Sequence, residues 1–221
     1  MSAAVPLLDI DQLVVEIQSM PALRGFSMHV TRGAMVSLVG RNGAGKTTLM
    51  RSIMGHLKPS QGTVRFEGTD LSARPRHSRA ALGIGYMPED RCLVPQLTVE
   101  ENILLPLWVA KHLDRKARLD FVYEVIGELA DMRHRKALLL SGGQQKLVAL
   151  GRALGIGTKC LLLDEPFEGI APALSERLSE VLASLKGKDL TLLMSQSDMN
   201  HSRELIDVEF TIERGANLAA A

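Results

Sequence analysis

Two kinds of hydrophobic pattern alternate along this chain. Short apolar runs predict strands, at residues 8–17, 27–30, 35–39, 63–66, 84–87, 160–163, 190–194 and 208–212. Between them, apolar residues recur every three or four positions and predict helices, which begin at Lys46, Thr98, Asp114, Ser141 and Pro172. The first two strands follow each other directly, and we expect a turn at Met20–Pro21 to join them. Apolar strands that alternate with amphipathic helices favour an α/β fold whose parallel sheet is covered on both faces.

The middle of the chain, about residues 95–139, carries helical patterns alone. Glu101 follows Thr98 at the spacing of a capping box, and this first helix meets an interruption at Pro106. Asp114 can cap the next helix. We therefore expect a helical subdomain inserted between strand-rich parts.

A glycine-rich segment lies between the strand at 35–39 and the helix that follows. It meets the phosphate-loop pattern Gly-x4-Gly-Lys-Thr in the required context, after a strand and before a helix, which disfavours a turn that merely joins the two. Glycines let main-chain N–H groups converge on phosphate oxygens, and the helix start adds its positive end. We expect Lys46 on the β and γ phosphates and the Thr47 hydroxyl on Mg²⁺, which prefers oxygen. The expected nucleotide-binding residues are Gly40, Arg41, Asn42, Gly43, Ala44, Gly45, Lys46, Thr47 and Thr48.

Two carboxylates end the apolar strand at 160–163. Asp164 and Glu165 lie at its carboxyl end, where open α/β sheets bind ligands. Phosphoryl transfer asks mainly for positioning and charge stabilisation. We therefore expect Asp164 to hold Mg²⁺ and Glu165 to polarise the attacking water. The alternative, a helix cap before Pro166, is disfavoured by the phosphate loop upstream.

Residues 141–144, Ser-Gly-Gly-Gln, begin a helix. Ser141 can cap it and Gln144 stands at the reciprocal capping position, so a helix start would explain these two residues. Gly142 and Gly143 cost backbone entropy there and are better explained by the close approach of a phosphate. One nucleotide does not need a second anion site, so this site makes sense if it closes over the nucleotide of another subunit.

With residues 140–144 as the signature, the motif set resembles the ATP-binding cassette ATPases over about residues 8–215. The resemblance implies a P-loop NTPase with a mostly parallel core sheet, an antiparallel β subdomain and the inserted helical subdomain, within one cassette domain at 1–221. It implies ATP and Mg²⁺ as cofactors. It also implies head-to-tail pairing, in which each signature completes the ATP site of a second cassette. The helical subdomain matches the part that meets transmembrane permease subunits.

Finer details resemble one branch, the ATPase subunits of importers of hydrophobic and branched-chain amino acids. Segment 86–91 places Glu89 where most cassettes carry a coupling-loop glutamine, and we expect Glu89 on the metal side of the site. Residues 168–172 are similar to the dimer-contact loop of this branch. Gln196 stands where most cassettes have a switch histidine, and we expect it to sense the γ phosphate by hydrogen bonding, since it exchanges no proton. Relatives that transport urea or small aromatic and carboxylic acids share these traits, which leaves the solute open.

The chain also departs from the family. Ile17 takes the place of the aromatic ring that stacks on adenine, so plain apolar contact replaces stacking. Ser195 replaces the glutamate of the branch, Phe167 replaces a small polar residue, and the sequence ends soon after Gly215. Because the phosphate loop and the Asp164–Glu165 pair are intact, we expect slower turnover rather than none.

Composition narrows the partners and the compartment. Apolar residues make up 46% and charged residues 23%, and the net charge of +1 gives no reason to expect nucleic acid. Cys92 and Cys160 lack metal-ligand spacing and fit a reducing compartment, and the six histidines, His201 included, are scattered. We find no export signal and no apolar run near the roughly 20 residues that span a bilayer. Trp108 with Leu105 leaves two interpretations open, a partner-facing patch and buried core.

We therefore expect the ATP-binding subunit of an importer, in the cytoplasm on the inner face of the cell membrane. It would hydrolyse ATP at a dimer interface to drive uptake of branched-chain amino acids or a related small solute. Its partners would be a second cassette, transmembrane permeases and, indirectly, a solute-binding protein. Two other interpretations stay open. One is a soluble cassette ATPase acting on nucleic acid or ribosomes, which usually has two cassettes or long coiled-coil insertions. The other is a catalytically weakened regulatory cassette, which Ile17 and Gln196 favour and Glu165 disfavours.

Overall fold

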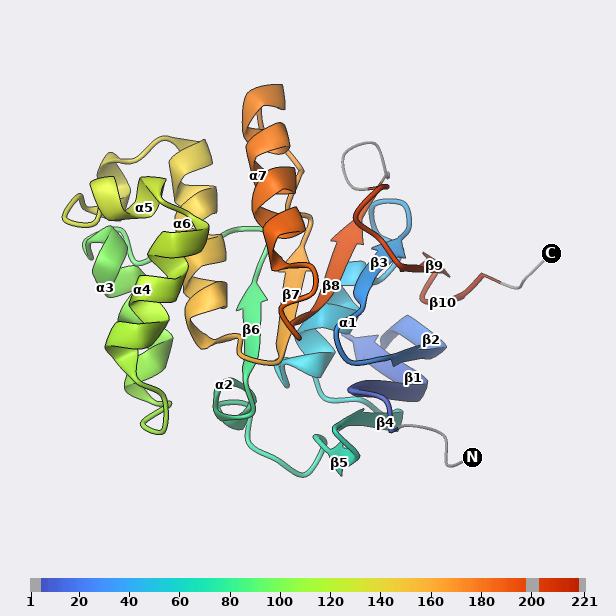
Figure 1. Ribbon diagram of the computed structural model, residues 1–221. Helices are drawn as coiled ribbons and strands as arrows, with labels where there is room; N and C mark the ends of the chain where they lie inside the picture. The colour runs from blue at the N-terminus through green and yellow to red at the C-terminus, as the bar shows by residue number, and fades with distance from the viewer. Residues whose placement is uncertain (1–4, 198–202, 219–221) are drawn as a thin grey trace.

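Two sheets and a group of helices make up the protein, whose computed structural model describes residues 5–197 and 203–218 (Figure 1). The larger sheet has the strand order β10-β9-β3-β8-β7-β6, and every neighbouring pair is parallel except β9 with β10. Its strands are β3 (Met35–Val39), β6 (Ile84–Met87), β7 (Cys160–Asp164), β8 (Thr191–Gln196), β9 (Val208–Glu213) and β10 (Ala216–Asn217). The prediction of an α/β fold with a mostly parallel core sheet is confirmed.

The smaller sheet is antiparallel, with the strand order β2-β1-β4-β5. Its strands are β1 (Leu8–Ile17), β2 (Met20–Val30), β4 (Gln61–Phe66) and β5 (Thr69–Asp70). The prediction of a turn at Met20–Pro21 is wrong, because β2 already begins at Met20, which pairs with Ile17. The turn consists of Gln18 and Ser19, whose φ angles of 51° and 64° are the left-handed values that a two-residue hairpin turn requires.

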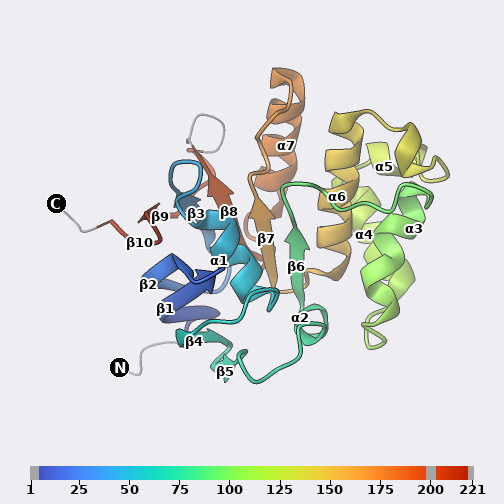
Figure 2. The same cartoon turned by 180° about the vertical axis from the view of Figure 1, so that it is seen from behind.

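Helices cover the larger sheet and extend beyond one of its edges. They are α1 (Lys46–Ile53), α2 (Ser78–Ala81), α3 (Val99–Leu104), α4 (Arg115–Val125), α5 (Glu128–Asp131), α6 (Gly142–Ile156) and α7 (Pro172–Leu185), with short 3-10 helices η1 (Leu105–Trp108) and η2 (Ala137–Leu139). In both views α3, α4 and α5 lie against α6, on the side away from the antiparallel sheet (Figures 1 and 2). Among the described helices, none combines the length and the apolar character needed to cross a membrane.

The helix starts in the middle of the chain follow their sequence signals. The Thr98 side chain accepts from the main-chain N–H of Glu101, and the Glu101 carboxylate accepts from that of Thr98, so the capping box is formed. Pro106 falls in η1, where the α-helix gives way to a tighter turn. Asp114 caps α4 by accepting from the N–H groups of Lys116 and Ala117.

Two large apolar cores and a small cluster of Leu107, Ala110 and Ile156 hold the molecule together. One lies between the two sheets, and the other joins the larger sheet to α6, α7 and the helices at 99–131. Leu150 of α6 is fully buried in the second core, where a leucine-to-alanine change typically costs about 2–5 kcal/mol. Trp108 is outside both cores, at 49% exposed beside Val109 at 64%, so the structure favours a surface patch over buried core at this position.

Candidate active site

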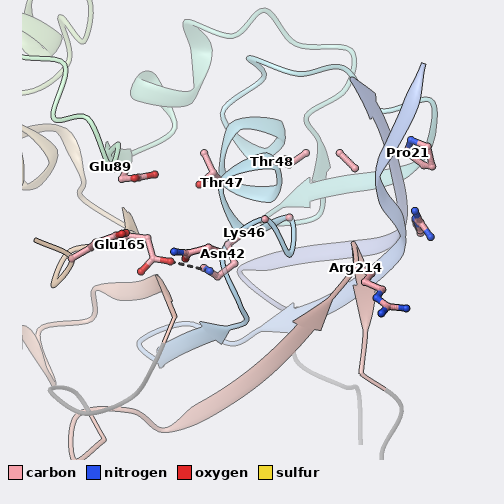
Figure 3. A pocket seen from close by; sticks show the side chains of 13 residues that line it. Pro21, Asn42, Lys46, Thr47, Thr48, Glu89, Glu165 and Arg214 are labelled. Atoms are coloured by element: carbon pink, nitrogen blue, oxygen red, sulfur yellow. Dashed lines mark ion pairs between the residues drawn. The ribbon is translucent and has the colours of Figure 1, made fainter. Parts of the chain in front are cut away.

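A cavity of about 560 Å³ opens over the loop between β3 and α1 (Figure 3). The loop needs its glycines for geometry. Gly45 has a φ of 113°, a value that glycine adopts readily, and a Cβ on Gly40 would come within 2.4 Å of the main-chain oxygen of Ile212. The cavity is lined by Pro21, Ala22, Arg24, Asn42, Gly43, Gly45, Lys46, Thr47, Thr48, Glu89, Glu165, Glu168 and Arg214.

The two ends of this cavity carry opposite charges. Figure 3 shows Glu89 and Glu165 on one side of the loop and Arg214 with Pro21 on the other, with Lys46 and Thr47 between them. Partial burial and the negative charges of Glu168, Asp164 and Glu165 raise the pKa of Glu89. The acidic end can thus take a cation or a proton donor, whereas the arginine end suits a polar or aromatic group.

The Lys46 ammonium lies among oxygen atoms at the floor of the cavity. Its Nζ donates to the main-chain oxygens of Gly40 (2.5 Å) and Arg41 (3.2 Å) and forms an ion pair with Glu165 Oε1 (2.9 Å). The residue is only 4% exposed. Charge-assisted bonds to anionic oxygens are stronger than bonds to neutral carbonyls, so this ammonium is placed to favour phosphate oxygens over the loop carbonyls.

The hydroxyl of Thr47 and the carboxylate of Asp164 meet beside the loop. Thr47 Oγ1 donates to Asp164 Oδ1 at 3.2 Å, and burial raises the pKa of Asp164. Magnesium prefers oxygen ligands and keeps several of its waters, so two protein oxygens together with phosphate oxygens make a suitable site. Among residues 5–197 and 203–218, no three or more His, Cys, Asp or Glu side chains are grouped to hold a metal ion by themselves. The donor set therefore fits Mg²⁺ bound together with a nucleotide.

Ser195 fixes the two acidic residues at the end of β7 relative to each other. Its Oγ donates to Asp164 Oδ1 at 2.6 Å and accepts from the main-chain N–H of Glu165 at 3.0 Å. Glu165 has a φ of 47°, which aims its side chain away from the strand direction and towards Lys46. Ser195, which replaces the glutamate of the importer branch, thus has a structural role that the sequence did not indicate.

Two polar residues, Gln196 and Ser197, lie at the end of β8. Gln196 is the last residue of β8, and its Nε2 donates to Ser37 Oγ on β3 at 3.1 Å. Ser197 instead faces Glu165, with its Oγ 2.9 Å from Glu165 Oε1 and 3.3 Å from Lys46 Nζ. The role of Gln196 in sensing the γ phosphate stays a prediction, and Ser197 adds a hydroxyl beside the Glu165 carboxylate. His201 lies outside the described residues.

Removal of the Ser197 hydroxyl is expected to lower the turnover of ATP by about ten- to 150-fold, because a hydrogen bond to a charged group contributes about 1.5–3 kcal/mol. Ser197→Ala would leave Glu165 Oε1 bonded to Lys46 alone, free to turn from its working direction. The measurement is steady-state phosphate release. Ser60→Ala, which removes an exposed hydroxyl bonded to Val14 O, is the matched control. Equal rates for both variants would argue against the assignment of Ser197.

The expected adenine contact, Ile17, lies at the end of the β1–β2 hairpin and is 42% exposed. The cavity wall at this end comes instead from Pro21, Ala22, Arg24 and Arg214. The two arginines were missed because they stand far apart in the sequence, on β2 and after β9. A main-chain bond from Arg24 N to Gly215 O joins these segments.

An aromatic ring at the hairpin end is expected to strengthen nucleotide binding. Ile17→Tyr should lower the Kd for ATP by about two- to tenfold, since ring stacking adds about 0.5–1.5 kcal/mol. Ile17→Leu is the control for size without a ring. Isothermal titration of both variants checks the prediction, and an unchanged or weaker Kd for the tyrosine variant would contradict it.

Residues 141–144 line a separate cavity of about 610 Å³, together with Arg91, Lys146 and residues 168–171. Ser141 and Gln144 form the expected capping box. Gly143 has a packing reason as well, since a Cβ there would come within 2.7 Å of Leu174 Cδ2. The structure therefore brings together the phosphate loop, Glu89, Asp164 and Glu165. Residues 141–144 line a second cavity, which shares Glu89 and Glu168 with the first.

The parallel sheet, the phosphate loop between β3 and α1 and the acidic pair after β7 define a P-loop nucleoside triphosphatase. A family model described as "ABC transporter" matches residues 23–168. This chain belongs to that family and is one of its ATPases, which bind ATP or ADP and hydrolyse ATP.

Relatives and solved structures extend the match to nearly the whole chain. The high-affinity branched-chain amino acid transport ATP-binding protein BraG of Pseudomonas aeruginosa is 32% identical, over 95% of this chain and 90% of its own. The lipopolysaccharide export system ATP-binding protein LptB of Haemophilus influenzae is 30% identical, over 96% and 89%. A nucleotide-free ATP-binding cassette from an ABC transporter superposes with a TM-score of 0.83 at 30% identity, over 97% of this chain and 90% of that one.

Proposed function

We propose that this protein is the ATPase subunit of an importer that takes up branched-chain amino acids or a related small solute. The observation that carries the catalytic part is the contact of Lys46 with Glu165 beside the Thr47–Asp164 pair, over one cavity. The similarity to BraG supports the class of solute. We infer that residues 1–221 form one cassette, with the helices of residues 95–139 as its inserted subdomain.

In this proposal the loop residues 40–48 hold the phosphates, with the Lys46 ammonium on the β and γ groups. Thr47 and Asp164, together with Glu89, would hold Mg²⁺, which would supply positive charge for the phosphate oxygens. The Glu165 carboxylate, steadied by Ser197, takes the proton of the attacking water. Gln196 supports this site from behind through Ser37 on β3.

The partners follow from the same arrangement. A second cassette would close the site, its Ser141, Gly142, Gly143 and Gln144 approaching the γ phosphate held by the first chain. Transmembrane permeases would contact the helical side, where Trp108 and Val109 are exposed, on the inner face of the cell membrane. The solute-binding protein acts through those permeases, and we expect no nucleic acid.

A second candidate function is the export of a lipid-linked substrate, which the similarity to LptB supports over almost the same part of the chain. The two candidates share the ATPase chemistry and differ in the permease that they energise. They can therefore be separated only with the permease present.

The test is ATPase activity of the complex that co-purifies with this chain, reconstituted into proteoliposomes. We expect ATP-dependent uptake of radiolabelled leucine when a solute-binding protein is added. Stimulation by lipopolysaccharide and not by leucine would favour the second candidate. Recovery of ribosomes or DNA in place of a permease would contradict both.

A further inference from the structure

One buried cation near the site has no role in the proposed chemistry. Lys146 lies in the second turn of α6, just after the signature glycines, and is 6% exposed. Its ammonium donates to two main-chain oxygens, that of Glu165 at 3.1 Å and that of Glu168 at 2.6 Å. Buried lysines are rare unless their charge is met by acceptors, so these two carbonyls account for its position.

The two carbonyls belong to the tight turn that follows β7. Glu168 N–H donates to Glu165 O at 3.2 Å, and Glu165 has a left-handed φ of 47°, a strained value for a residue with a side chain. The same conformation aims the Glu165 carboxylate at Lys46 Nζ, 2.9 Å away. A change in the conformation of this turn would therefore re-orient the Glu165 carboxylate.

The main chain of Lys146 belongs to α6, the helix that begins at Gly142. Lys146 follows Gly142 and Gly143 by one helical turn and lines the same cavity as they do. Its side chain is thus a direct connection between residues that face a partner's nucleotide and the base that serves this chain's own nucleotide.

We propose that Lys146 is a positioning residue that links the two ATP sites of a cassette dimer, by tying the turn that carries Glu165 to the start of α6. This inference rests on the proposed function. Burial and the nearby Arg91 lower the pKa of Lys146 to about 8, while Glu168, Glu165 and Glu89 oppose that shift. In the part of the chain that the structure describes, the Lys146 ammonium is held by two carbonyls and forms no ion pair with a carboxylate.

The test compares Lys146→Met, which keeps the length and loses the donors, with Lys146→Arg, which keeps charge and donors. We expect kcat to fall about tenfold in the methionine variant, with the KM for ATP within about twofold, and to recover in the arginine variant. Lys159→Met, which removes a lysine paired with Glu67 away from the site, is the control. An equal fall in kcat in both Lys146 variants, together with a lowered Tm, would show that Lys146 only contributes to packing and would overturn the proposal.

Mixed dimers with one Glu165→Gln chain test the link itself, because one site alone then hydrolyses ATP. Lys146→Met is placed first in the chain that keeps Glu165 and then in its partner. Slow hydrolysis in both arrangements supports the link, whereas loss in one arrangement alone overturns it. If the parent mixed dimer, without any change at Lys146, releases no phosphate, the proposed function fails instead.

Discussion

Glu165→Gln is expected to lower ATP hydrolysis by at least about 100-fold while ATP still binds. The amide keeps the size of the side chain and an oxygen that can accept from Lys46 and Ser197, so the site keeps its shape. It cannot take a proton from water. ATP should therefore stay bound, and the protein should persist as a dimer that gel filtration detects in the presence of ATP and Mg²⁺.

The matched control for this experiment is Glu176→Gln, an exposed glutamate on α7. It makes the same chemical change outside the site and should hydrolyse ATP as the wild type does. Phosphate release by Glu165→Gln at the rate of this control would show that another group acts as the base.

Gly142→Asp is expected to lower ATP hydrolysis by a similar factor, at least about 100-fold. The binding of ATP to a single subunit should not weaken. The new carboxylate would stand where a partner's phosphate approaches, and two like charges at about 4 Å repel by about 4 kcal/mol at an effective dielectric of 20. The fold should tolerate it. The nearest atom to a Cβ there is the end of the flexible Arg91 side chain at 3.3 Å, and a helix start favours an acid.

A mixture of two inactive variants tests whether the signature acts across the dimer. Dimers of Gly142→Asp with Lys46→Ala contain one site with an intact phosphate loop and an intact signature. Such dimers should hydrolyse more ATP than either variant alone. If Gly142→Asp alone retains wild-type turnover, or the mixture stays inactive while both variants dimerise, residues 141–144 do not act in this way.

Features set by neighbouring residues could be predicted from the sequence. The capping box of Ser141 and Gln144 depends on a spacing of three residues, and the phosphate loop depends on glycines next to Lys46. Each of these local signals led to the element that the structure contains. The Thr47–Asp164 contact was also predictable. Asp164 ends β7 and Thr47 begins the helix that follows β3 and the phosphate loop, and these parallel strands of one sheet have their carboxyl ends at the same edge.

Features set by distant segments could not be predicted in this way. The contact of Ser197 with Glu165 Oε1 joins residues 32 positions apart and belongs to no local motif. The contact of Lys146 with Glu165 O joins residues 19 positions apart and depends on how α6 packs on the turn after β7. No spacing in the sequence reports that packing.

The uneven charge of the phosphate-loop cavity bears on which form of the nucleotide binds there. Glu89, Glu165 and Glu168 face the end where the terminal phosphate would lie, and like charges repel most strongly where water is excluded. Nucleotide that arrives without a divalent cation meets this repulsion uncompensated, whereas the magnesium complex brings its own positive charge. Occupancy of the cavity should therefore follow the concentration of free magnesium as closely as that of ATP.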